Sequence, residues 1–160
     1  MPPLLFCFLL GGFCGSRTMT PATVLCWFAF AVKLPTQGTW FAFLASPLMV
    51  AIFTTAAIAE LILDKLPITR SRLQPTGLIA RMCTGALVGT VLAGVLQQSG
   101  RAGALLGVSG AVIGALVGYW LRTRIVKWTG WPDYVVGLME DATAIAGSIT
   151  VVAFALARLN

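Results

Sequence analysis

The chain has 160 residues, of which 58% are hydrophobic and only 10% are charged, and its formal net charge is +6. A soluble domain carries about 25% charged residues, so this composition excludes an ordinary soluble protein and predicts an integral membrane protein with one domain, residues 1–160. The basic residues flank apolar runs, as they do beside a bilayer, so we expect no nucleic-acid partner.

The first apolar run, residues 4–32, is longer than the roughly 20 residues that cross a bilayer. It is interrupted between Gly15 and Pro21, and Arg17 lies inside this interruption. Thr20 suits the N-cap of a second helix, and Pro21 suits its first turn. The sequence therefore predicts either two short helices around a break, as in many transporters, or one long helix kinked at Pro21.

The second apolar run covers residues 40–63, and we expect Pro47 to kink this helix. Glu60 and Asp64 lie four residues apart at its end, so they share one helical face. Asp64 fits an interfacial residue paired with Lys65, whereas Glu60 lies one turn deeper.

The next two apolar runs are predicted to form an antiparallel helical hairpin. They cover residues 78–96 and 103–121, with a turn near Ser99 and Gly100. Small residues recur at every fourth position in both helices, which lets helices approach closely. The glycines of this pattern are Gly85, Gly89, Gly103, Gly107, Gly110, Gly114 and Gly118. The pattern favours tight helix packing or homodimerisation, and a pore-lining face is the alternative.

The last apolar run, residues 134–156, contains two adjacent carboxylates, Glu140 and Asp141. Ionisable side chains at such a depth are costly, so they usually face a protein interior or a hydrated path and have a partner. Thr143 continues the Glu140 face of the same helix. This stretch is therefore the strongest candidate for a functional site.

These runs together predict an all-α membrane protein with about five transmembrane helices and with termini on opposite sides. If the first run is a re-entrant hairpin instead, the N-terminus moves to the other side and the rest is unchanged. Seven basic residues of the connections fall on the N-terminal side and three on the other, which assigns the N-terminal side to the cytoplasm. Glu60, Glu140 and Asp141 then lie at similar depth, and Arg17 is the one cation deep enough to join them. Gly-x3-Gly pairs followed by arginine in the first and fourth runs suggest inverted two-helix repeats around a central helix.

Several short motifs resemble a known family. They are Arg17-Thr18-Met19-Thr20-Pro21, Glu60-x3-Asp64-Lys65-Leu66-Pro67, Arg70-x-Arg72, Pro75 and the glycine-rich hairpin. With them the chain resembles, over nearly its whole length, a family of small glycine-rich bacterial membrane proteins described as a domain of unknown function. The family pattern has serine where Thr18 stands here. The resemblance implies the class and a bacterial inner-membrane location, but no activity.

The acidic residues predict a small transporter or channel for a cation or proton. Its candidate ion- or substrate-binding residues are Arg17, as counter-charge, and Thr20, Glu60, Asp64, Glu140, Asp141 and Thr143. Carboxylate oxygens suit hard divalent cations, so Glu60, Glu140 and Asp141 are the expected ligands if the ion is a metal, and we expect no other cofactor. Five short spans enclose little volume, so a homodimer in the lipid bilayer is the expected assembly around a small ion or solute.

Two alternatives stay open. In a structural or accessory membrane protein, Arg17 would form a buried ion pair with Glu60 or Glu140. In the other, Arg17 and the helix N-terminus at Pro21 would bind a small anion. An enzyme is disfavoured, because the chain has no histidine and no serine-nucleophile motif. A lipid-active metal site at Glu140 and Asp141 is the least supported reading.

Overall fold

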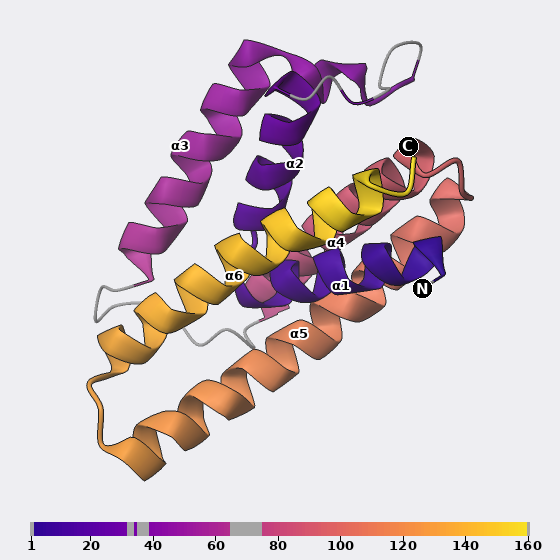
Figure 1. Cartoon of the computed structure of the whole chain (residues 1–160). Coiled ribbons are helices and arrows are strands. Elements are labelled where there is room, and N and C mark those ends of the chain that lie inside the picture. The colour runs from indigo at the N-terminus through magenta and orange to yellow at the C-terminus, as the bar shows by residue number, and fades with distance from the viewer. Residues whose placement is uncertain (1, 32–33, 35–38, 65–74, 160) are drawn as a thin grey trace.

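The computed structural model describes residues 2–31, 34, 39–64 and 75–159, and within these ranges every regular element is a helix. The elements are α1 (Pro3–Ser16), α2 (Thr20–Ala31), the short 3₁₀-helix η1 (Ala42–Ala45), α3 (Pro47–Leu63), α4 (Pro75–Val95), α5 (Gly100–Thr129) and α6 (Asp133–Leu156). The prediction of an all-α fold is confirmed (Figure 1). The basic loop that contains Lys65, Arg70 and Arg72 lies outside the described residues.

Three of the described helices, α4, α5 and α6, are long and apolar enough to cross a membrane, which indicates a membrane protein. The other apolar helices, α1, α2 and α3, are shorter than 18 residues. Length and hydropathy therefore support three spanning helices among the described ones, and the count of five stays a prediction.

The first apolar run is divided into two helices, as one of the two sequence readings predicted. α1 ends at Ser16 and α2 begins at Thr20. Figure 1 shows α1 running from one end of the molecule to its middle, where α2 leaves at a steep angle. The break therefore lies deep inside the helical assembly, and Arg17 lies within it.

Two predicted helix features were wrong. Pro47 does not kink a longer helix; it occupies the first turn of α3, where its missing N–H is harmless, and the Ser46 hydroxyl accepts a hydrogen bond from the Met49 N–H over 3.3 Å. α5 continues eight residues past the predicted end at Leu121, and Gly130 terminates it in a left-handed conformation with φ of 68°.

Glycines allow α1, α4 and α5 to pack with their backbones almost in contact. A Cβ atom added at Gly107 would lie 2.0 Å from the carbonyl oxygen of Gly85, and one added at Gly114 would lie 2.0 Å from that of Gly12. Similar contacts involve Gly11, Gly15, Gly89, Gly103 and Gly110. α5 therefore packs against both α1 and α4 within one chain. Gly118 lines a groove that is described below.

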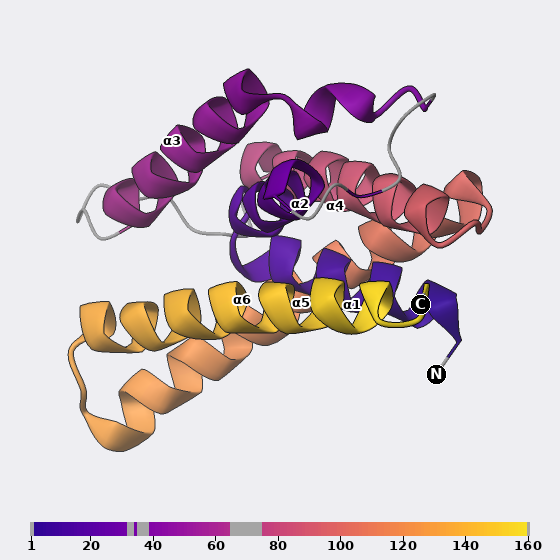
Figure 2. The same ribbon diagram turned by 45° about the horizontal axis from the view of Figure 1, so that its top comes forward.

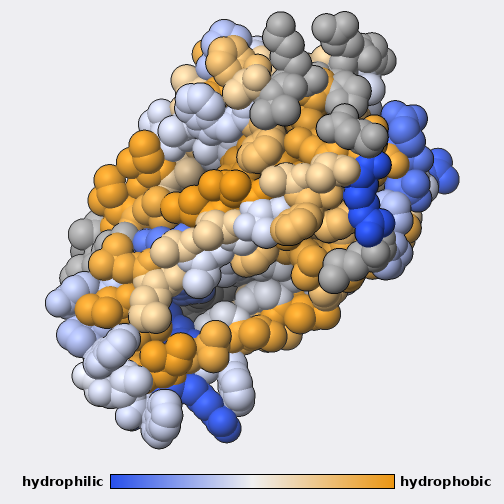
Figure 3. All heavy atoms as spheres, viewed as in Figure 1, coloured by the Kyte–Doolittle hydropathy of each residue, from blue (hydrophilic) through white to orange (hydrophobic). Residues whose placement is uncertain are grey.

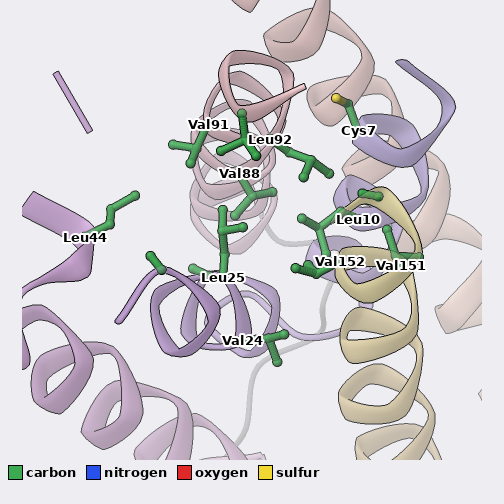
Figure 4. Close-up of a cluster of buried hydrophobic side chains, with 14 of the residues drawn as sticks. Cys7, Leu10, Val24, Leu25, Leu44, Val88, Val91, Leu92, Val151 and Val152 are labelled. Carbon is green, nitrogen blue, oxygen red and sulfur yellow. The ribbon is translucent and has the colours of Figure 1, made fainter. Parts of the chain in front are cut away.

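The apolar core lies where α1, α2, α4 and α6 meet. Figure 4 shows side chains from these helices pointing toward one another, among them Leu10, Leu25, Val88 and Val152. All four side chains are at most 1% exposed. This core fixes the break between α1 and α2 against α4 and α6, and so it positions the charged residues beside the break.

The two chain termini lie near each other at one end of the molecule, beside the turn between α4 and α5 (Figures 1 and 2). The sequence predicted five complete spans, which would place the termini at opposite ends. The termini lie at the same end because α1 reaches only the middle of the molecule before the chain turns into α2. The turn between α5 and α6 lies at the other end.

Candidate functional site

Arg17 is the centre of the charged cluster. Its side chain is 1% exposed, and its guanidinium group forms ion pairs with Asp64, at the end of α3, and with Asp141, on α6. Arg17 therefore joins the break to two helices that are far apart in the sequence. Asp64 is more than an interfacial residue, since its carboxylate is only 16% exposed and belongs to this cluster.

Glu60 caps the start of α2. Its two carboxylate oxygens accept hydrogen bonds from the backbone N–H groups of Thr18, over 2.7 Å, and Met19, over 2.8 Å. The first N–H groups of a helix have no partner within the helix, and the helix dipole attracts negative charge to this end. The prediction that Thr20 acts as the N-cap was wrong: Thr20 is the first residue of α2, and within the described part of the chain its buried hydroxyl has no hydrogen-bond partner.

Arg81 binds the α1 side of the break, and the sequence analysis did not predict this role. This arginine lies on α4, is 7% exposed, and donates a hydrogen bond to the carbonyl oxygen of Gly15 over 2.6 Å. A cation suits this position because the last carbonyl groups of α1 carry the negative end of the helix dipole. The sequence grouped Arg81 with the basic connections, although it lies six residues inside α4.

Glu140 belongs to a second cluster around Arg122. The Arg122 guanidinium donates a hydrogen bond to Asp133 over 2.8 Å and lies 3.8 Å from Glu140. The expected pairs of Arg17 with Glu60 or Glu140 are thus replaced by pairs with Asp64 and Asp141. Neighbouring positions on α6 point about 100° apart, which explains why Glu140 and Asp141 meet different arginines.

The expected metal ligands do not share one site. Glu60 is bound to backbone amides, Asp141 to Arg17, and Glu140 lies beside Arg122. Across residues 2–31, 39–64 and 75–159, no three acidic, cysteine or histidine side chains are grouped so that they could hold a metal ion. Thr143 is exposed, and its hydroxyl donates to the backbone carbonyl of Glu140 over 2.9 Å.

The charged clusters link helices and occupy backbone amides beside the break. Arg17 is shared by carboxylates from two helices, so a change at either carboxylate alters how that helix is held to the break. The two amides that directly precede α2, those of Thr18 and Met19, are occupied by Glu60, so a small anion would have to displace a carboxylate to bind these two.

Residues 4–159 match the model of a protein family that is described as Domain of unknown function (DUF4126). Comparisons with curated proteins and with solved structures gave no match.

Proposed function

This chain belongs to the DUF4126 family of domains of unknown function, and we propose that it is a small multipass membrane transporter or channel that binds a cation or proton at the carboxylates around Arg17. The site residues in this proposal are Arg17, Asp64 and Asp141, with Glu60 and Arg81 holding the break in place.

The observation that carries the proposal is the sharing of one buried arginine by two carboxylates. If Asp141 takes up a proton or a cation, Arg17 keeps Asp64 as its partner, and the ion pair that joins α6 to the break is lost. If Asp64 does so, the ion pair between the break and the end of α3 is lost instead. A shared charge of this kind gives the helix assembly two alternative arrangements, which a transported ion can select between.

The surrounding architecture supports the same proposal. Deep ionisable residues in membrane proteins usually mark ion paths, and broken helices place backbone charge at such paths. In the proposed topology α1 and α2 form a re-entrant pair, α3 to α6 cross the membrane, and the end with Arg122, Arg124 and Lys127 is cytoplasmic. A bacterial inner membrane and a homodimer complete the proposal.

A second candidate is a structural or accessory role. It is favoured by the hydrogen bonds on both sides of the break. Glu60 accepts from the two amides before α2, and Arg81 donates to a carbonyl oxygen of α1. A network whose only task is to fix helix register would have the same contacts.

Ion flux in liposomes tests the proposal. The purified chain is reconstituted, and entry of H⁺, Na⁺, K⁺ and Mg²⁺ is followed with ion-sensitive dyes for wild type, Asp141→Asn and Asp133→Asn. Asp133 is the matched control, because the chemical change is the same at a side chain that is 65% exposed. We expect flux of one ion in the wild type and in Asp133→Asn, and at least a tenfold loss in Asp141→Asn.

Melting curves in detergent show whether each variant is folded. Absence of flux for all four ions in the wild type, or full flux in a folded Asp141→Asn, would support the structural candidate and overturn transport at this site.

A further inference from the structure

A groove lies between α1, α5 and α6. It exists because α6 packs mainly on α1 and α2 and only lightly on α5. Its volume is about 440 Å³, which lies within the usual range for small-molecule sites. Figure 3 shows it as a hollow between α5 and α6 on this face of the molecule.

Most of the groove is apolar. Gly110, Gly114 and Gly118 of α5 form part of its wall, and apolar side chains such as Phe13, Val117 and Met139 form much of the rest. Gly110 and Gly114 bring α1 close to α5 at the base of the groove, and Gly118 is partly exposed, so a chain of methylene groups can lie against the apolar side chains and the α5 backbone near Gly118. A groove of this shape on a membrane protein suits an extended hydrocarbon chain.

One end of the groove is charged. Arg122 and Glu140 line it there. On a helix, residues seven apart share a face, so Arg124 continues the face of Val117 and Trp128 continues that of Leu121. Both Arg124 and Trp128 are exposed. The groove-lining face of α5 therefore leads directly to a cation and an indole ring.

Trp128 and Arg124 fit the interface between hydrocarbon and headgroups. Trp128 is 91% exposed, and tryptophan is enriched at this level of a bilayer. The Arg124 guanidinium lies 4.2 Å from the centre of the Trp120 ring, which holds it near the surface of α5. Lys127 is also exposed at this end. The cations Arg122, Arg124 and Lys127 outnumber the carboxylates Asp133 and Glu140 that lie beside Arg122. An anionic headgroup therefore complements this end, as a hydrocarbon chain complements the other.

We propose that the groove binds one acyl chain of an anionic phospholipid, with the lipid phosphate at Arg124 and Lys127 beside Arg122. The groove is apolar along its wall and has exposed cations at one end. A lipid carries both an acyl chain and a phosphate, so it fits this groove better than a second copy of the chain, which carries no phosphate. The inference depends on a membrane location and does not depend on ion transport.

Lipid retention by the full chain tests the proposal. The protein is purified in detergent, delipidated and titrated with phosphatidylglycerol or phosphatidylcholine of identical acyl chains, and bound lipid is counted by native mass spectrometry. Val117→Trp fills the groove, and Leu116→Trp is its control, because Leu116 is exposed on the same helix and does not line the groove. Arg124→Gln removes a headgroup contact, and Arg101→Gln removes an exposed arginine from the first turn of α5.

We expect one phosphatidylglycerol bound in preference to phosphatidylcholine. Val117→Trp should abolish it, and Arg124→Gln should weaken the preference by about fivefold, the effect of one basic residue near an anionic headgroup. Both control variants should bind as the wild type does. Equal retention of the two lipids, unchanged binding in a folded Val117→Trp, or a lipid-free dimer that Val117→Trp converts to monomer would overturn the proposal.

Discussion

Arg17 and Asp141 form a buried ion pair that joins the break near the start of the chain to its last helix. The two residues are 1% and 6% exposed. Because Asp64 contacts the same guanidinium group, Arg17 connects α3, α6 and the break through one side chain. The stability of the break and the position of α6 should therefore depend on each other.

Removal of one member of this cluster should be more damaging than removal of a matched pair. Arg17→Met leaves the buried Asp141 and the partly buried Asp64 without their arginine, and we expect a loss of about 3–5 kcal/mol. In Arg17→Met combined with Asp141→Asn, the loss should be smaller than the sum of the two single losses. Reversible unfolding in mixed micelles measures all three variants, and strictly additive losses would show that the pair is not coupled.

Glu60→Gln and Glu60→Ala should differ. Glutamine keeps one carbonyl acceptor for the amides of Thr18 and Met19, whereas alanine keeps none. Because hydrogen bonds to charged groups contribute about 1.5–3 kcal/mol, we expect alanine to destabilise by an amount in this range and glutamine by less. Hydrogen exchange of the peptide that contains these two amides provides the direct measurement. Equal protection in wild type and Glu60→Ala would rule out the cap.

Gly11 and Gly12 offer a matched pair on α1. A Cβ at Gly11 would lie 2.2 Å from the Gly107 carbonyl oxygen, whereas one at Gly12 would lie 3.8 Å from its nearest neighbour, the Gly110 carbonyl oxygen. Gly11→Ala must therefore separate α1 from α5, and overpacking of this kind costs about 1–3 kcal/mol. Gly12→Ala should be neutral or stabilising by up to about 1 kcal/mol, because alanine favours a helix. Similar melting temperatures for the two variants would contradict this packing.

Both termini should report the same side of the membrane. They lie together at the end of the molecule that holds the turn between α4 and α5. Reporter fusions that fluoresce only in the cytoplasm should therefore give the same signal at either terminus. A fusion at the turn between α5 and α6 should give the opposite signal, and opposite signals from the two termini would restore the five-span topology.

The sequence predicted local features well. The segment from Gly15 to Pro21 combined glycine, serine and proline inside an apolar run, so a break was visible without a structure, and the described helices place it at residues 17–19. The last helix was placed almost correctly because its apolar run begins directly after Pro132 and Asp133. The end of α5 was misplaced because Arg122, Arg124 and Lys127 were treated as loop residues, although arginine and lysine are good helix formers.

The partners of the charged side chains could not be predicted, because spacing along the chain gives depth and face but not neighbours. Arg81 illustrates the limit, since its contact with Gly15 depends on how α4 crosses α1. Glu60 is a second example. Its place near the end of a helix was visible, but its partners are backbone amides, which every residue except proline carries and which leave no mark in a sequence.

The cluster around Arg17 also sets an order for biosynthesis. During synthesis Arg17 is made early, and Glu60, Asp64 and Arg81 follow. Asp141 is made near the end, so the ion pairs of the break are complete only when α6 has been made. A nascent or truncated chain that lacks α6 would lack the Asp141 partner of Arg17, and we expect such a chain to be recognised by chaperones and proteases. We therefore expect maturation of the break to depend on complete synthesis of the chain, because an arginine near its start is paired with an aspartate near its end.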